Sequence, residues 1–155
     1  MKVRIAAVGR LRSGAEADLI ADYRTRFDRT GRALGLGPLD IREVEARKGG
    51  MEAEADLLRK ATTDARPIIA LDERGKTLTS PQFAEQLARW RDDGAPEACF
   101  LIGGADGLSP ALQDQADHAL SFGKMVWPHM LARVMLVEQL YRAASILAGS
   151  PYHRE

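Results

Sequence analysis

Residues 99–107 read Cys-Phe-Leu-Ile-Gly-Gly-Ala-Asp-Gly, and Ser109-Pro110 follow directly after Leu108. The first four residues predict a buried strand, the glycines predict a tight turn, and the Ser-Pro pair predicts the start of a helix. In α/β proteins a small ligand binds where such a strand ends at the carboxyl edge of a sheet. Positive φ angles would let the backbone approach that ligand at three glycines, Gly103, Gly104 and Gly107. A plain strand-to-helix turn is the alternative interpretation of this segment.

The rest of the chain alternates strand patterns with helix patterns. Strands are expected over residues 1–8, 39–44, 67–71, 98–102 and 119–122. Helices are expected over residues 15–34, 51–62, 81–93, 110–116 and 130–148. Ser80 is the expected N-cap of the third helix, with Pro81 at its first position. The order predicts an α/β fold in one domain of 155 residues, a mostly parallel sheet with helices on both faces.

Composition narrows the class of protein. Apolar residues make up 45% and charged residues 28% of the chain, as in an ordinary globular domain. No apolar run approaches the roughly 20 residues that cross a bilayer, and no signal segment opens the chain, so we expect a cytoplasmic protein without a membrane partner. Cys99 is interpreted as a small buried hydrophobe rather than a nucleophile. The 22 basic and 22 acidic residues balance, so the net charge does not indicate a nucleic-acid partner.

The expected last helix, over residues 130–148, is apolar around most of its circumference. Only a narrow polar stripe interrupts it, formed by Glu138, Arg142 and Ser145. Such a helix must be covered on more than one side. A second subunit is one source of that cover, and a central position in the core of a monomer is the alternative.

Several motifs together resemble one family. They are Lys2–Gly9 (K-V-R-I-A-A-V-G), L-I-G-G-A-D-G at 101–107, S-F-G-K-M-V-W-P-H at 121–129, E-Q-L-Y-R-A at 138–143 and Y-H-R-E at 152–155. The chain resembles the RlmH family of large-subunit ribosomal RNA methyltransferases, a minimal branch of the SPOUT superfamily. The resemblance implies a homodimer with a C-terminal trefoil knot that binds S-adenosyl-L-methionine and no metal. It also implies methylation of N3 of a pseudouridine in a 23S rRNA stem-loop on assembled 70S ribosomes.

The resemblance places the cofactor at three expected strand ends. These contacts fall on Leu71, on Gly103 with Gly104 beside it, and on a loop formed by Phe122, Gly123, Lys124, Met125, Val126 and Trp127. Backbone groups there would bind the adenine edge, apolar side chains would enclose the ring, and Gly104 would leave room for a bent cofactor. No G-x-G-x-x-G follows the first strand, so the pattern differs from that of a Rossmann enzyme.

The resemblance also directs attention to residues 152–154 as catalytic candidates. His153 is a candidate general base, Arg154 would stabilise the imide anion or bind phosphate, and Tyr152 would stack on a base. In a dimer this segment would complete the partner's site, whereas a frayed chain end is the alternative. Two alternative functions are a ribosome-associated binding protein without catalysis and an unrelated small nucleotide-binding enzyme.

The roles of three further polar residues stay open between alternatives, and a fourth is expected to be structural. His129 would cap a helix, line the cofactor pocket or touch RNA. Arg133 and Arg142 would face substrate or pair with Glu138, and the i,i+4 spacing of Glu138 and Arg142 favours an ion pair for the latter. His118 is expected to be exposed and structural.

Overall fold

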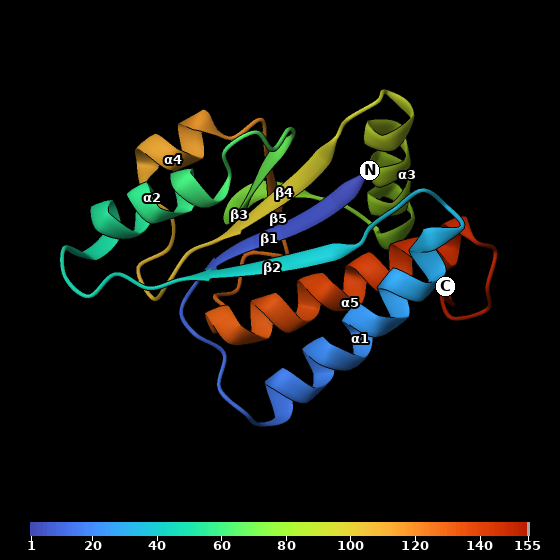
Figure 1. Ribbon diagram of the computed structural model, residues 1–155, viewed down its shortest axis with the longest axis horizontal. Helices are drawn as coiled ribbons and strands as arrows, with labels where there is room; N and C mark the ends of the chain where they lie inside the picture. Colours follow the sequence, from blue (N-terminus) through green and yellow to red (C-terminus); the bar gives the residue numbers. More distant parts are fainter. Residues whose placement is uncertain (155) are drawn as a thin grey trace.

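The computed structural model describes residues 1–154 and contains five strands and five helices in that part of the chain (Figure 1). In chain order the elements are β1 (Lys2–Val8), α1 (Ala15–Arg32), β2 (Leu39–Val44), α2 (Gly50–Ala61), β3 (Ile68–Thr77), α3 (Ser80–Asp92), β4 (Glu97–Ile102), α4 (Pro110–Gln115), β5 (His118–Ser121) and α5 (His129–Leu147). The expected alternation of strands and helices is therefore confirmed.

The five strands form one sheet in the order β2-β1-β4-β3-β5, and every neighbouring pair is parallel. Ile5 of β1, for example, is in register with Ile41 of β2 and Phe100 of β4. In Figure 1, α2 and α4 lie on one side of the sheet, and α1 and α5 lie on the other. The predicted fold class, a parallel sheet covered on both faces, is confirmed. The trefoil knot stays a prediction.

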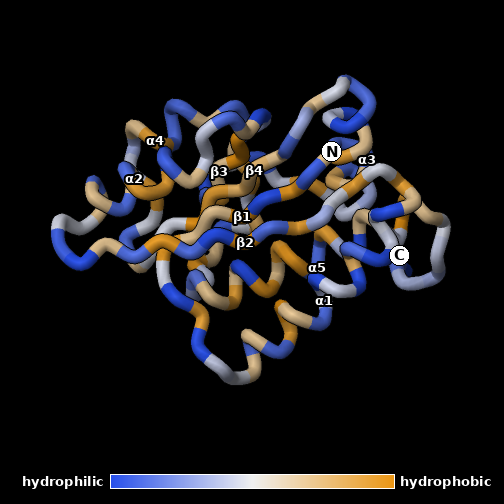
Figure 2. Tube along the Cα trace, viewed as in Figure 1, coloured by the Kyte–Doolittle hydropathy of each residue, from blue (hydrophilic) through white to orange (hydrophobic). Residues whose placement is uncertain are grey.

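The apolar residues of the strands divide into two cores because successive side chains point to opposite faces. Ile5 and Ala7 pack on the side of α1, α3 and α5, whereas Ala6 and Val8 pack on the side of α2 and α4. Figure 2 shows hydrophobic residues running through the centre of the trace and hydrophilic residues gathered in outer loops. Each face of the sheet therefore has its own core.

Much of the apolar surface of α5 is covered within the chain. The helix packs against the sheet, α1 and α3, and its Leu136, Val137 and Leu140 are fully buried. Leu131 at its N-terminal end stays 41% exposed. The central-core interpretation accounts for most of this helix, and the cover by a second subunit stays a prediction.

Two local predictions were wrong. β3 does not end at Leu71 but continues to Thr77 after a register shift, because Gly75 lets it lie against β5: a Cβ at Gly75 would be 2.7 Å from the carbonyl carbon of Ala119. The N-cap of α3 is Thr79, not Ser80. Its hydroxyl accepts from the Gln82 amide at 3.2 Å, and the Gln82 side chain accepts from the Thr79 amide at 2.9 Å.

The expectations for three residues, Ser109, Cys99 and His118, agree with the structure. Ser109 caps α4 by accepting from the Leu112 amide at 3.2 Å. Cys99 is fully buried in β4, as a small hydrophobe is expected to be. His118 is exposed, although it begins β5 and lies with its ring 5.2 Å from that of Trp90. Within residues 1–154 no helix is long and apolar enough to cross a membrane, and no cluster of side chains is arranged to hold a metal ion.

Candidate functional site

A cavity of about 640 Å³ opens at the edge of the sheet where β4 and β5 end, beside the register shift in β3. We call it the edge cavity. Its walls come from residues 71–74 within β3, from Ile102 and the turn 103–108 at the end of β4, and from Leu120 and the loop 122–127 at the end of β5, with His129 and Ala132 of α5 behind them. The structure thus brings together the three segments predicted to bind the cofactor. Every residue of that predicted set lines the cavity except Lys124.

The segment after β5 forms the outer wall of the edge cavity. The buried Ser121 hydroxyl donates to the Glu73 carbonyl at 3.0 Å and accepts from the Gly123 amide at 3.0 Å, which ties this segment to β3. After Gly123 the side chains of this loop are exposed to solvent, Met125 by 74% and Val126 by 84%. The anchored part is therefore fixed, while the apolar loop beyond it is open to a ligand.

The glycine turn is built differently from the prediction. Among its three glycines only Gly107 has a positive φ, of 77°, so the prediction was wrong for Gly103 and Gly104. Gly103 is required for another reason, because a Cβ there would lie 2.4 Å from the carbonyl carbon of Gly107. A Cβ on Gly104 would meet Val8 at 3.1 Å and the Glu54 carboxylate at 3.4 Å. Close backbone packing explains Gly103, and two nearby side chains crowd Gly104, so neither glycine is explained by an unusual φ angle.

A polar cluster on the edge cavity was missed by the sequence analysis. Arg74 donates to both carboxylate oxygens of Asp72, through Nε at 3.1 Å and Nη2 at 3.0 Å, and Nη2 also reaches the Gln113 side-chain oxygen at 2.8 Å. The hydrogen bonds from Arg74 lower the pKa of Asp72, so its carboxylate stays ionised. The available signal was a pair of opposite charges two residues apart, directly after the apolar run of residues 67–71. The cluster places an ion pair, Asp72 with Arg74, on the wall of the edge cavity.

His129 and Arg133 lie one turn apart at the start of α5 and behave differently. His129 lines the edge cavity, which is one of the three roles left open for it. Arg133 is fully buried and donates to the carbonyls of Val8 at 3.3 Å and Gly9 at 3.0 Å, and to the Glu43 carboxylate at 2.8 Å. The expected pairing of Arg133 with Glu138 was wrong, because Arg133 pairs with Glu43 of β2, and its full burial within the chain leaves no surface to face a substrate.

The predicted catalytic segment lies elsewhere, against the C-terminal half of α5. Tyr152 donates to the Glu138 carboxylate at 3.0 Å, and Arg142 Nη1 is 3.2 Å from His153 Nδ1. Arg142 also pairs with Glu138 at 2.7 Å, so that ion pair was correctly predicted. Burial, followed by hydrogen bonding, raises the pKa of the Tyr152 phenol. Arg154 is exposed.

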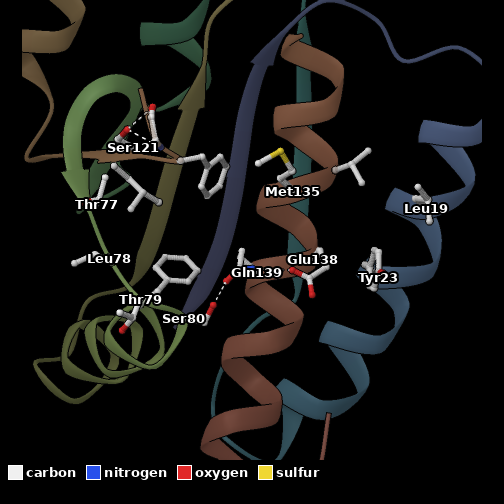
Figure 3. Close-up of a pocket in the computed structure, with 15 residues that line it drawn as sticks. Leu19, Tyr23, Thr77, Leu78, Thr79, Ser80, Ser121, Met135, Glu138 and Gln139 are labelled. Carbon is white, nitrogen blue, oxygen red and sulfur yellow. Dashed lines mark hydrogen bonds between the residues drawn. The ribbon is translucent and has the colours of Figure 1, made fainter. Parts of the chain in front are cut away.

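A second cavity, of about 520 Å³, lies between α1, α5 and the start of α3 (Figure 3). Tyr23 and Glu138 line it, and the Ser80 hydroxyl donates across it to the Gln139 side-chain oxygen at 2.7 Å. It shares three residues with the edge cavity, namely Leu120, Phe122 and Gly123. Tyr152, His153 and Arg154 do not line the edge cavity, so within one chain the structure does not unite the predicted catalytic and cofactor residues.

Solved structures of low sequence identity share this fold. A probable methyltransferase from Bordetella pertussis matches with a TM-score of 0.52 and 13% identity, over 92% of this chain and 96% of that one. A putative methyltransferase from Legionella pneumophila, solved in complex with the bound cofactor SAM, matches with a TM-score of 0.50 and 14% identity, over 92% and 66%. The fold is therefore one found among methyltransferases.

Sequence comparison identifies the family. The model of the family described as "Predicted SPOUT methyltransferase" matches residues 1–153. Proteins from Dinoroseobacter shibae and Cereibacter sphaeroides are 69% and 67% identical over 155 residues, covering 99% of both chains in each case. Both carry the name ribosomal RNA large subunit methyltransferase H. The chain belongs to the SPOUT methyltransferases and, within them, to the ribosomal RNA large subunit methyltransferase H family, as its motifs predicted.

Proposed function

We propose that this protein is a cytoplasmic homodimer that uses S-adenosyl-L-methionine to methylate N3 of a pseudouridine in 23S rRNA on the assembled 70S ribosome. The observation that carries the proposal is the edge cavity, formed by the same three segments on which the resemblance places the cofactor. The names of the relatives support ribosomal RNA as the substrate. The resemblance in sequence supports the position on the pseudouridine and the ribosomal context.

The residues of the edge cavity fit the cofactor. Its volume of about 640 Å³ falls within the range of small-molecule pockets, roughly 300–1,000 Å³. Leu71 and Phe122 offer apolar walls for an adenine ring, backbone groups of residues 103–107 are available to its polar edge, and Asp72 offers acceptors to hydroxyl groups. When bound, S-adenosyl-L-methionine supplies an electrophilic methyl group on a sulfonium.

The remaining task of the chain is to make an imide nitrogen reactive, since N3 is protonated at neutral pH. A cation or hydrogen-bond donor near the imide favours loss of that proton because it stabilises the anion. Residues 152–154 supply such groups, with Arg154 exposed and free to contact the substrate. These groups lie away from the edge cavity of their own chain, so we assign them to the cavity of a second chain.

The surface supports such a dimer. Leu19 of α1, Trp127 before α5 and Leu131 of α5 are large apolar side chains that stay 41–43% exposed. A second copy would cover them and bring its residues 152–154 toward the edge cavity. The protein carries no net charge, so shape rather than a strongly basic surface would select the folded RNA.

The test combines binding with product analysis. Purified protein is incubated with S-adenosyl-L-methionine and ribosomes that lack the modification, and nuclease digests are analysed by mass spectrometry. We expect one N3-methylated pseudouridine. Cofactor and ribosome binding without this product would favour the non-catalytic binding protein, and absence of cofactor binding in calorimetry would favour the unrelated enzyme.

A pair of matched substitutions locates the cofactor. Leu71→Ala removes part of a wall of the edge cavity and should weaken cofactor binding about tenfold, since burial of a leucine side chain contributes roughly 1.5–3 kcal/mol. Leu34→Ala makes the same chemical change beyond the end of α1, away from both cavities, and should leave the affinity unchanged. Equal affinities of the two variants would place the cofactor elsewhere.

A further inference from the structure

The contact between Arg142 and His153 determines which nitrogen of the His153 ring carries the proton. Arg142 Nη1 lies 3.2 Å from His153 Nδ1. A guanidinium has only donors, so Nδ1 must accept this hydrogen bond. A neutral imidazole that accepts at Nδ1 carries its proton on Nε2. The ring therefore carries a donor, not a base, at Nε2.

Arg142 is held in the position that makes this contact. Its Nε and Nη2 donate to Glu138 Oε1 at 3.0 and 2.7 Å, and its guanidinium lies 4.8 Å from the centre of the Tyr152 ring. The Tyr152 hydroxyl donates to the same oxygen of Glu138 at 3.0 Å. Rotation of the guanidinium away from His153 would disrupt this set of contacts. The orientation is thus fixed by the i,i+4 pair of α5.

The other nitrogen of the His153 ring, Nε2, lacks a hydrogen-bond partner among the described residues. This nitrogen is also buried. A buried donor without an acceptor costs about 1–3 kcal/mol, and such a group in a folded protein calls for an explanation. An acceptor supplied from outside the chain would remove this cost.

We propose that His153 serves as a hydrogen-bond donor to the substrate rather than as a general base, and that Arg142 is the positioning residue that sets this role. The inference rests on the proposed function and replaces the sequence-based assignment of His153. The acceptor is a carbonyl oxygen of the uracil-type ring, because carbonyls flank the imide nitrogen on both sides. When the N3–H bond breaks, its electron pair stays on the ring and spreads onto these oxygens, and the proton leaves to water. Donation from Nε2 stabilises that charge.

Nitrogen NMR tests the tautomer without any need for activity. The chain has three histidines, so protein labelled with ¹⁵N-histidine gives few signals, and His118→Gln and His129→Gln assign them by elimination. At about pH 8, where an ordinary imidazole is neutral, His153 should show a protonated Nε2 and a bare Nδ1. Arg142→Met should mix the two tautomers. A wild-type His153 protonated at Nδ1 would overturn the inference, whatever the outcome of the ribosome assay.

Substitutions of His153 test the chemical role. In His153→Gln the side-chain amide replaces the Nε2–H donor but cannot accept a proton as a base. We expect turnover on ribosomes within about tenfold of the wild type for His153→Gln, and a loss of about 100-fold or more for His153→Ala, as for removal of one donor to a developing anion. Thermal unfolding would first show that both variants are folded. Equal losses of turnover in the two variants would then support His153 as a general base and refute its role as a donor.

Discussion

The two ends of α5 each carry an arginine, and the contacts of these arginines differ in kind. Arg133, near the N-terminal end, is fully buried and bonds two backbone carbonyls of the β1 region and Glu43 of β2. Arg142, near the other end, keeps 24% of its side chain exposed and bonds only side chains, those of Glu138 and His153. Arg133 is therefore hydrogen-bonded to the sheet, whereas Arg142 belongs to a cluster of side chains on α5.

This difference indicates that the two parts of the proposed site, the edge cavity and the cluster around Arg142, differ in how rigidly they are held before a ligand binds. Backbone acceptors at the end of a strand have fixed positions because the sheet holds them, so the edge cavity beside Arg133 exists before any ligand arrives. Side-chain partners can exchange, so the cluster around Arg142 is able to adjust to a substrate or a second chain. Three predictions test this contrast, in order of decreasing effect.

The largest effect is expected at the fixed end. Arg133→Met should lower the free energy of unfolding by about 3 kcal/mol, because it leaves the Glu43 carboxylate without its cationic partner and two carbonyls without the arginine donor. Arg142→Met is the matched change at the other end and should cost less than about 1 kcal/mol, as expected for a partly exposed pair. Urea unfolding measures both. Similar losses of unfolding free energy in the two variants would contradict the proposed difference between the two ends of α5.

A second prediction sharpens the picture of the preformed cavity. Gly103→Ala should cost about 2 kcal/mol and weaken cofactor binding, because its Cβ would collide with the Gly107 backbone at 2.4 Å and shift the turn. Gly107→Ala meets no atom within 4 Å, although its φ of 77° makes alanine unfavourable by roughly 1 kcal/mol. Calorimetry should therefore show the greater loss of affinity for Gly103→Ala. The opposite order would mean that the turn moves freely.

The smallest effect is expected in the side-chain cluster. Tyr152→Phe removes the hydrogen bond to Glu138 and should cost about 1 kcal/mol at neutral pH. The pKa of Tyr152 is raised above its ordinary value of 10.0, so the native state holds the phenolic proton more tightly than the unfolded chain does. That contribution is complete below pH 10 and is lost as the pH rises through the native pKa.

Urea unfolding between pH 9 and pH 11, with ultraviolet detection of tyrosinate, checks the alkaline behaviour. The wild type should lose stability more steeply above pH 10 than Tyr152→Phe does, because the variant has no such proton to lose. Parallel curves for the two proteins would show that the phenol is not held in the cluster.

The sequence predicted the elements well where local chemistry decided them. The Ser109 cap and the bounds of β2 came directly from residue types, and alternating apolar residues located β1. Thr79 was missed although Gln82 three residues later completes a capping box, a signal visible in the sequence. The extension of β3 could not be found in this way, because it depends on how Gly75 meets the backbone of Ala119 some forty residues later.

The same division holds for the candidate site. Motifs alone located the cavity segments through the family that they share, and the i,i+4 spacing predicted the pair of Glu138 and Arg142. Arg133 gave no such signal, because its partner Glu43 is separated from it by 90 positions in the chain. Spacing within one helix is a local property, whereas a contact between α5 and β2 exists only after the sheet has formed.

By itself, the sequence determined the order of strands and helices, the faces that they bury and the family to which the chain belongs, because these follow from residue types at short spacings. Only the tertiary structure decided that Gly103 is needed for backbone packing and that Arg133 is buried. It also decided that Tyr152 and His153 pack against α5, where Arg142 sets the tautomer of His153. Each of these depends on atoms brought together from distant parts of the chain, and their distances are fixed only when the cores on both faces of the sheet have packed.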